Sequence, residues 1–141
     1  MLIHQTQLQQ LREAATAASQ KAYCPYSRFA VGAALLADDG RIFTGCNVEN
    51  ASYGLTICAE RNAVFHAVAA GVRRIVALVV FTPTSTATAP CGACRQVLNE
   101  FGADAEVVTF CNGSGSRRFR LTELLPAAFG PESLAERGDG K

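Results

Sequence analysis

Three cysteines and one glutamate in this sequence have the types and spacing of a metal site. Cys58 and Glu60 belong to the segment CAE, and Cys91 and Cys94 belong to the segment PCGAC. Each segment lies where a helical pattern begins, so the unpaired N–H groups and the helix dipole would stabilise thiolates there. Three thiolates from two neighbouring helix starts suit a tetrahedral Zn²⁺ ion. We therefore expect Cys58, Cys91 and Cys94 to bind one zinc ion per chain.

The fourth ligand decides what such a site can do. A closed structural site needs another Cys or His, whereas a catalytic site keeps a water molecule. His66 lies on the same predicted helix as Cys58 but about 12 Å along it, at a rise of 1.5 Å per residue. His66 is therefore expected to pack against the fold, and His4 lies near the chain start. The other cysteines are expected to be small buried hydrophobic residues; they are Cys24, Cys46 and Cys111. An open, catalytic site is favoured.

Glu60 supplies the acid–base group that an open site needs. It stands two residues after Cys58 and projects from the same first helical turn, near the metal without binding it. A carboxylate there can accept a proton from metal-bound water and return it to a leaving group. Glu60 could instead only complement the helix dipole. The three neighbouring thiols favour the catalytic interpretation.

The patterns around these motifs predict one α/β domain. Helices are predicted at 5–23, 58–70, 90–101 and 121–125, and strands at 28–37, 41–46, 73–81, 105–111 and 117–121. The link at 112–116 is long enough for a hairpin but not for a parallel crossover, so the last strand should run antiparallel to its neighbour. We expect a three-layer α/β/α sandwich around a mixed five-stranded sheet in residues 1–130, followed by a partly ordered tail at 131–141.

Composition and charge exclude several classes of function. The chain has 141 residues, of which 49% are hydrophobic and 18% charged, as in one globular domain. A net charge of +1 without a long basic run argues against a nucleic-acid partner. The sequence also has no apolar run of the roughly 20 residues that a membrane span requires. Its beginning is unlike a signal peptide, so we expect a cytoplasmic protein that does not bind membranes.

The motifs CAERNA and PCGACRQ together resemble the cytidine deaminase family. In zinc deaminases, the first metal ligand is followed two residues later by Glu, and a P-C-x-x-C motif comes later in the sequence. The resemblance extends from about Tyr23 to Gly130 and is closest to the small, three-cysteine, homotetrameric branch. Cys58 in place of histidine distinguishes enzymes acting on free nucleosides from most polynucleotide-editing relatives. The resemblance implies a cytidine deaminase-like fold and a nucleoside substrate. It also implies a homo-oligomer, specifically a tetramer, with active sites shared between subunits.

The same resemblance implies a reaction and a role for each metal-site residue. Cytidine and deoxycytidine would be deaminated by hydrolysis to uridine and deoxyuridine, with release of ammonia, in pyrimidine salvage. A zinc hydroxide would attack C4 of the pyrimidine while Glu60 protonates N3 and then the departing ammonia. Arg61 would donate hydrogen bonds to the sulfur ligands and offset their negative charge; taken alone, it could be a surface arginine.

The segment NVEN at 47–50 supplies candidate ribose ligands. In an extended segment Asn47 and Glu49 point to the same side, where an amide and a carboxylate suit sugar hydroxyls. Without the zinc motif, the segment could be an ordinary polar loop with an Asn turn. The resemblance identifies Asn47 and Glu49 as the ribose-binding pair and Phe29 as the ring that packs on the base. It adds further substrate contacts, some of them crossing between subunits: Ala51, Tyr53, Ala59 and Phe129.

Three other interpretations remain open at the level of sequence. Cys91 and Cys94 form a C-x-x-C pair at a helix start, as in thiol–disulfide oxidoreductases, but this leaves Cys58 and Glu60 unexplained. A zinc-stabilised module without activity would need a fourth protein ligand. The third is a deaminase of a modified nucleoside, of the blasticidin S type. Asn47 and Glu49 argue against it, because this pair fits an ordinary ribose.

Overall fold

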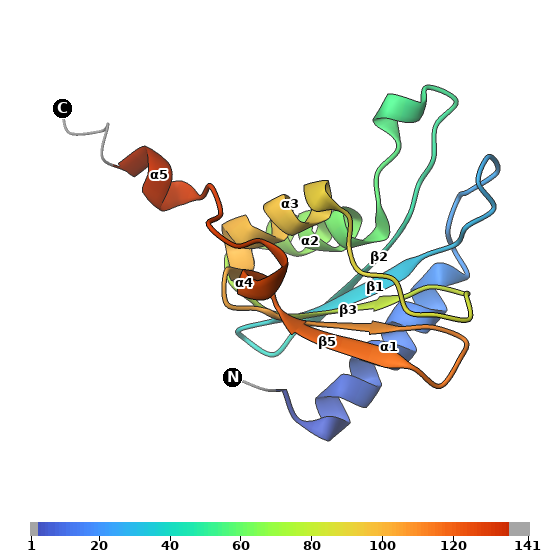
Figure 1. The fold of residues 1–141 in the computed structure, drawn as a ribbon, viewed down its shortest axis with the longest axis horizontal. Coiled ribbons are helices and arrows are strands. Elements are labelled where there is room, and N and C mark those ends of the chain that lie inside the picture. The colour runs from blue at the N-terminus through green and yellow to red at the C-terminus, as the bar shows by residue number, and fades with distance from the viewer. Residues whose placement is uncertain (1–2, 136–141) are drawn as a thin grey trace.

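A single mixed sheet of five strands forms the centre of the molecule (Figure 1). The computed structural model describes residues 3–135 of the chain. Its strands lie in the order β2-β1-β3-β4-β5; β3 and β4 are parallel, and the other neighbours are antiparallel. The elements in chain order are α1 (Gln5–Ser19), β1 (Gly32–Ala37), β2 (Ile42–Cys46), the 3-10 helix η1 (Tyr53–Leu55), α2 (Ala59–Ala69), β3 (Ile75–Phe81), α3 (Gly92–Gly102), β4 (Glu106–Phe110), β5 (Ser116–Arg120), α4 (Leu121–Leu124) and α5 (Pro131–Ala135).

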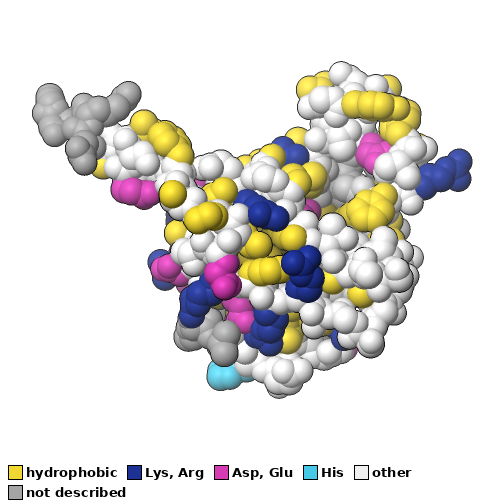
Figure 2. All heavy atoms as spheres, viewed as in Figure 1, with side chains coloured by type: hydrophobic (Ala, Val, Ile, Leu, Met, Phe, Trp, Pro, Cys, Tyr) yellow, Lys and Arg dark blue, Asp and Glu magenta, His cyan; other side chains and the backbone are white. Residues whose placement is uncertain are grey.

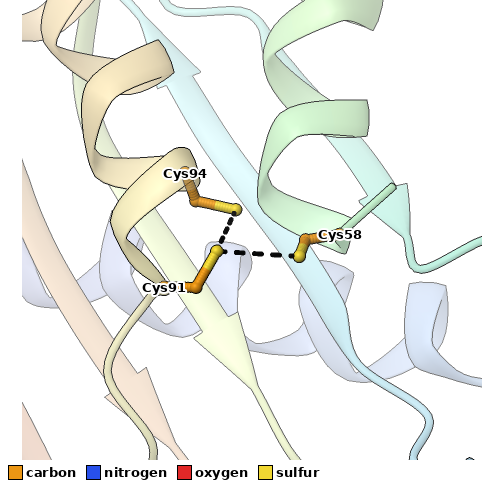
Figure 3. A group of neighbouring side chains, drawn as sticks. All are labelled: Cys58, Cys91 and Cys94. Atoms are coloured by element: carbon orange, nitrogen blue, oxygen red, sulfur yellow. Dashed lines mark hydrogen bonds between the residues drawn. The ribbon is translucent and has the colours of Figure 1, made fainter. Parts of the chain in front are cut away.

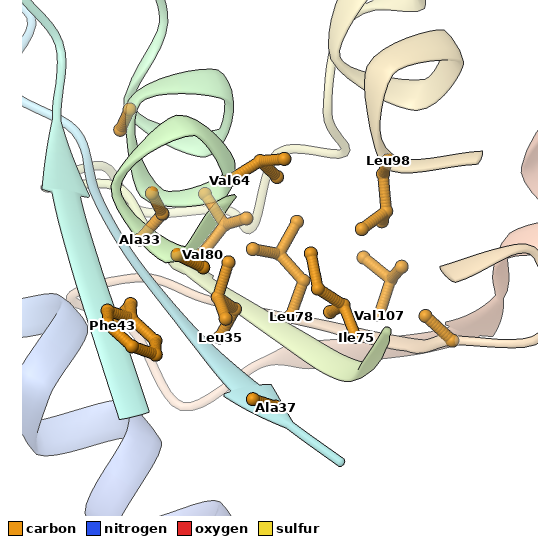
Figure 4. Close-up of a cluster of buried hydrophobic side chains, with 14 of the residues drawn as sticks. Ala33, Leu35, Ala37, Phe43, Val64, Ile75, Leu78, Val80, Leu98 and Val107 are labelled. Carbon is orange, nitrogen blue, oxygen red and sulfur yellow. The ribbon is translucent and has the colours of Figure 1, made fainter. Parts of the chain in front are cut away.

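Helices cover both faces of this sheet. Side chains alternate between the two faces along each strand, so Leu78 and Val80 of β3 face α2 and α3, whereas Val79 faces α1. The larger hydrophobic core lies under α2 and α3, where Leu35, Leu78 and Val64 are fully buried or nearly so (Figure 4). The predicted three-layer sandwich with an antiparallel last strand is therefore confirmed.

The strand directions bring the starts of α2 and α3 to one edge of the sheet. β1 runs antiparallel to both β2 and β3, so β2 and β3 point the same way. The chain leaves the carboxyl end of β2 before entering α2, and leaves the carboxyl end of β3 before entering α3. Both helices therefore return across the same face of the sheet, with their N-termini at the same edge (Figure 1).

Two glycines allow the helices to lie directly on the sheet. A Cβ atom on Gly45 of β2 would stand 2.4 Å from the Ala63 nitrogen and 2.6 Å from the Ala59 carbonyl oxygen of α2. On the other face, a Cβ on Gly32 of β1 would stand 1.9 Å from the Ala15 carbonyl oxygen of α1. These distances are far below any carbon contact, so no side chain fits at either position.

Three predicted boundaries were wrong, two of them because loop residues pair in ways that their sequence pattern does not indicate. The helix predicted at 5–23 ends at Ser19, because Tyr23 forms an extended pair with the segment after β2. The strand predicted at 28–37 begins only at Gly32. Pro90, predicted to lie in the first helical turn, precedes α3, whose N-cap is Cys91.

The chain also forms a helix where the sequence indicated the beginning of a tail. Helix α5 starts at Pro131, a residue that suits the first helical position. The backbone N–H of Ser133 donates to the Gly130 carbonyl at 2.9 Å, and the Ser133 hydroxyl accepts from the Gly130 N–H at 3.2 Å. The end of the predicted tail, residues 136–141, lies outside the described residues. Among the helices of residues 3–135, none has the length and apolar character that crossing a membrane requires.

The contact of α2 with Gly45 can be tested by adding one methyl group. Gly45→Ala should lower the free energy of unfolding by about 1–3 kcal/mol, because the backbone of α2 must move away from β2. Gly115→Ala is the matched control, since a Cβ there meets nothing within 4 Å. Urea denaturation of both variants measures the difference. Equal stabilities would contradict the close seating of α2.

Candidate metal centre and active site

Three sulfur atoms converge between the starts of α2 and α3. Cys58 is the N-cap residue of α2, Cys91 is the N-cap residue of α3, and Cys94 is in the first turn of α3. The Sγ atoms of Cys58 and Cys91 are 3.8 Å apart, and those of Cys91 and Cys94 are 3.5 Å apart (Figure 3). The predicted grouping of these residues is therefore present in the fold.

The spacing of these sulfurs fits a tetrahedral thiolate site. A Zn–S bond of about 2.3 Å places two ligand sulfurs about 3.8 Å apart around a tetrahedral ion. All three Sγ atoms lie within 4.8 Å of one another, and within the described part of the chain no fourth Cys, His, Asp or Glu belongs to this group. The donor set therefore accommodates a zinc ion and leaves one position for a ligand that is not a side chain.

Positive potential surrounds the sulfurs on the protein side. The Arg61 Nη2 atom lies 3.5 Å from the Cys58 Sγ atom, and this hydrogen bond raises the pKa of Arg61. The pKa of Cys58 is lowered to about 5, chiefly by a hydrogen bond from the Cys94 thiol and then by Arg61, although partial burial opposes the shift. Three thiolates and one Zn²⁺ carry a formal charge of −1. Arg61 and the two helix N-termini lie where they would offset that charge if zinc were bound.

Glu60 lies next to the sulfurs but is not one of their group. It occupies the first turn of α2, is 7% exposed and contributes to the wall of an adjoining cavity. Burial, which disfavours the charged carboxylate, raises the pKa of Glu60 to about 7. A carboxyl group with this pKa can both accept and release a proton near neutral pH.

The cavity beside Glu60 brings together residues from several loops and strand ends. Its volume is about 240 Å³. Seven of the residues predicted for the site line it: Phe29, Asn47, Glu49, Cys58, Ala59, Glu60 and Cys91. A second cavity of about 360 Å³ shares the wall residues Ser27, Glu49 and Thr56 and is also lined by Tyr26 and Tyr53.

Three of the predicted substrate contacts are not in the wall of the cavity beside Glu60. Tyr53 lines the second cavity and is 73% exposed. Ala51 is exposed in the loop before η1. Phe129 is 60% exposed, and its carbonyl accepts a hydrogen bond of 2.8 Å from the Gln96 side chain on α3. Within one chain, these three residues are on the outer surface.

The side chain of Asn47 organises the backbone opposite the sulfurs. It is 8% exposed; its Oδ1 atom accepts the Val31 N–H at 2.8 Å, and its Nδ2 atom donates to the Phe29 carbonyl at 2.7 Å. The backbone N–H of Asn47 still donates to the Val31 carbonyl at 3.3 Å, but the Val31 N–H bonds the Asn47 side chain instead of its backbone, so regular pairing ends here and β1 starts at Gly32. An amide has two donor hydrogens and an oxygen with two lone pairs, so Asn47 keeps one donor and one acceptor site.

The Glu49 carboxylate holds the next part of the same loop. It accepts the backbone N–H groups of Tyr26 at 3.0 Å and Ser27 at 3.1 Å, and also the Ser27 hydroxyl. The Ser27 hydroxyl first, and then these N–H groups, lower the pKa of Glu49. Three of the roughly four acceptor sites of a carboxylate are thus used, which leaves one for a ligand hydroxyl.

Sequence reasoning missed several residues of the cavity wall. Val80 and Thr82 lie at the carboxyl end of β3, where open α/β sheets usually bind ligands, and this position could have identified them. Thr88 and Ala89 also line the cavity. They belong to an irregular loop without periodicity, so no local signal indicated them.

The residues expected to be structural lie apart from the sulfurs. The His66 Nδ1 atom is 3.1 Å from the Thr44 carbonyl, and its ring contacts Phe43 edge-on, as expected for a packed histidine. Cys111 is buried, as expected. Cys24 and Cys46 are instead half-exposed.

Comparison with known proteins agrees with this geometry. Residues 5–111 match the family described as the cytidine and deoxycytidylate deaminase zinc-binding region. The cytidine deaminase of Sporosarcina psychrophila is 50% identical over 119 residues, which cover 84% of this chain and 88% of that protein. The crystal structure of the Burkholderia pseudomallei cytidine deaminase is 51% identical and superposes with a TM-score of 0.83, covering 91% of this chain and 100% of that one. The Mycobacterium tuberculosis cytidine deaminase structure is 50% identical, with a TM-score of 0.76 over 87% of this chain and 97% of that one.

The metal centre can be tested by removing one sulfur. Cys91→Ala should lose bound zinc and lower the thermal midpoint, because metal binding at such sites contributes to folding free energy. Cys24→Ala is the control, since its thiol lies outside the sulfur group. Zinc content by mass spectrometry and thermal unfolding measure both effects. Unchanged zinc content in Cys91→Ala would remove Cys91 from the ligands.

Proposed function

This chain belongs to the cytidine and deoxycytidylate deaminase family, and from that premise we propose that it is a zinc-dependent cytidine deaminase. It converts cytidine and deoxycytidine to uridine and deoxyuridine by hydrolysis and releases ammonia. The observation that carries this proposal is the group of three thiols beside a buried carboxylate at one cavity. A role in pyrimidine salvage in the cytoplasm is part of the same proposal.

Cys58, Cys91 and Cys94 would hold the zinc ion through their thiolates. Bound zinc lowers the pKa of a coordinated water so that it becomes a nucleophile near neutral pH. The protein must then supply a group that moves protons, because the water loses two protons and the base gains them. Glu60 is the buried carboxyl group that lies beside the sulfurs and lines the cavity.

Glu60 accounts for both proton transfers. It takes a proton from the attacking water and delivers it to N3 of the pyrimidine as the C4–O bond forms. It then takes the remaining hydroxyl proton and delivers it to the amino group, so that the C4–N bond breaks and ammonia leaves. A C4 carbonyl remains, which is the base of the uridine product. A pKa of about 7 supports this exchange in both directions.

The remaining acceptor site of Glu49 and the remaining sites of Asn47 would bind the ribose hydroxyls. Both residues line the cavity, and their other hydrogen bonds hold them in place before a ligand arrives. The ring of Phe29 would pack on the pyrimidine, with Ala59 at the start of α2 close to the base. Thr56 and Ser27 line both cavities and give the nucleoside a continuous polar wall.

We propose a homotetramer with shared active sites as the assembled state. Exposed apolar side chains include Tyr53, Leu55, Phe129 and Leu134. They belong to η1 and to the segment that enters and forms α5, which project from the body of the chain in Figure 1. Figure 2 shows hydrophobic side chains on both projections. Such side chains usually mark an interface. Ala51, Tyr53 and Phe129 would each contact the substrate of a neighbouring subunit rather than that of their own.

A thiol–disulfide function is supported less well. The Cys91 and Cys94 sulfurs are 3.5 Å apart, which a C-x-x-C redox pair would also allow. That function gives no role to Cys58, whose sulfur completes the group, or to the buried Glu60. Zinc retained in the presence of a reductant would separate the two functions.

The proposed reaction has a direct test. Purified protein mixed with cytidine should remove the cytosine absorbance and release ammonia, and prior treatment with a strong zinc chelator should abolish both signals. Absence of turnover in the zinc-loaded protein would overturn the proposal.

The role of Glu60 can be tested separately from metal binding. Glu60→Gln should reduce kcat by about 10²–10⁴-fold, because the amide cannot carry a proton, while zinc remains bound. Glu100→Gln, a change at an exposed residue of α3, is the control and should leave kcat unchanged. A Glu60→Gln enzyme with near wild-type kcat would leave Glu60 as a helix-end charge only.

A further inference from the structure

The loop that leads into Cys91 has few attachments to the rest of the fold. It carries a metal-ligating sulfur at its end and two cavity-wall residues, Thr88 and Ala89. Across residues 87–90, all within the described part, the one hydrogen bond is that of the Pro90 carbonyl. Its donor is the Arg95 Nε atom, at 2.8 Å.

The same Arg95 side chain holds a second segment. Its Nη1 atom donates to the Leu124 carbonyl at 2.9 Å, at the last residue of α4. Further along α3, the Gln96 side chain donates to the Phe129 carbonyl at 2.8 Å. Arg95 therefore connects the entry to the metal site with the C-terminal segment, although these two segments are far apart in sequence.

The guanidinium group suits this bridging position. It is planar and presents several donors in a fixed geometry, so one side chain can hold two carbonyl groups at once. The direction in which the Arg95 side chain extends also matters. Arg95 follows Cys94 directly and reaches back across the first turn of α3 to the residue before Cys91. Displacement of Pro90 would move the Cys91 sulfur relative to Cys58.

We propose that Arg95 is a positioning residue of the metal centre. Its hydrogen bond to the Pro90 carbonyl holds Cys91 in place and also holds the adjoining cavity wall. This inference rests on the proposed zinc-dependent function. Arg95 itself touches neither the sulfurs nor the cavity, so it acts through the loop. Because it also holds the Leu124 carbonyl, the arrangement of the C-terminal segment is coupled to that of the metal ligands.

Arg73 offers a matched control for a purely structural role. Its Nη1 atom donates to the carbonyl of Val68, in the last turn of α2, at 3.1 Å and to that of Val72, just beyond α2, at 2.9 Å. It is thus another arginine that holds two carbonyls, at the opposite end of a helix from the sulfurs. Arg73→Met removes such a bridge without affecting the approach to the metal.

The experiment measures zinc release rather than activity alone. Wild type, Arg95→Met and Arg73→Met are loaded with zinc and mixed with a chromophoric chelator well below their unfolding temperatures. Arg95→Met should release zinc about 10- to 100-fold faster than wild type, as is typical when a group that supports a metal ligand is lost. Arg73→Met should release it at the wild-type rate. The cobalt-substituted Arg95→Met protein should also show shifted thiolate–cobalt absorption bands, which Arg73→Met should not.

The outcomes distinguish a failure of the inference from a failure of the proposed function. Equal zinc release and unchanged cobalt spectra in Arg95→Met and Arg73→Met would overturn the positioning role while the wild type still deaminates cytidine. If Arg95→Met does not fold, Arg95→Lys takes its place. The lysine ammonium cannot reproduce the planar guanidinium that holds both carbonyls, so the Arg95→Lys protein should still release zinc faster than wild type. A wild-type rate of release from Arg95→Lys would overturn the inference. A wild type that binds no zinc would instead contradict the proposed function.

Discussion

The directions of β2 and β3 are the constraint on which the rest of the structure depends. Because β1 is antiparallel to both, these two strands end at the same edge of the sheet, and the helices that follow begin there side by side. Backbone N–H groups at both helix starts are then directed at one small volume. That volume favours negative charge before any ion is bound. The N-cap positions of Cys58 and Cys91 place their sulfur atoms at these two helix starts.

Polar side chains replace regular backbone pairing on the opposite wall of the cavity. Asn47 bonds the backbone on both sides of Ala30, and Glu49 bonds that of Tyr26 and Ser27. The loop from 23 to 31 is therefore shaped by the two side chains that are proposed to bind ribose. Asn47 is buried and Glu49 is partly exposed, and both have most of their hydrogen-bonding sites occupied, which holds their side chains in place. A ligand that meets them loses little free energy in ordering the site.

Much of this arrangement could be predicted from the sequence because its signals are local. The sulfurs and Glu60 fall into two short motifs at helix starts, and the strands around Leu35 and Val79 are strongly apolar. The boundaries at Ser19 and Gly32 could not be predicted, because side-chain bonds from Asn47 and pairing of Tyr23 decide them across the fold. The wall at Thr88 comes from an irregular loop and left no periodic pattern. The roles proposed for Tyr53 and Phe129 rest on the family resemblance, because both side chains are exposed within one chain.

The two glycine contacts also limit how this fold can be made more heat-resistant. Replacing glycine by alanine commonly stabilises proteins because the unfolded chain loses conformational freedom. That route is closed at Gly32 and Gly45, where the opposing helix backbone fills the space that a methyl group would need. It is open at Gly54, Gly92 and Gly115, where a Cβ would meet nothing within 4 Å, but not at Gly40 and Gly71, whose φ angles of 92° and 98° are in the left-handed region. Thermostable variants of this chain should therefore keep both strand glycines and gain their stability from loops.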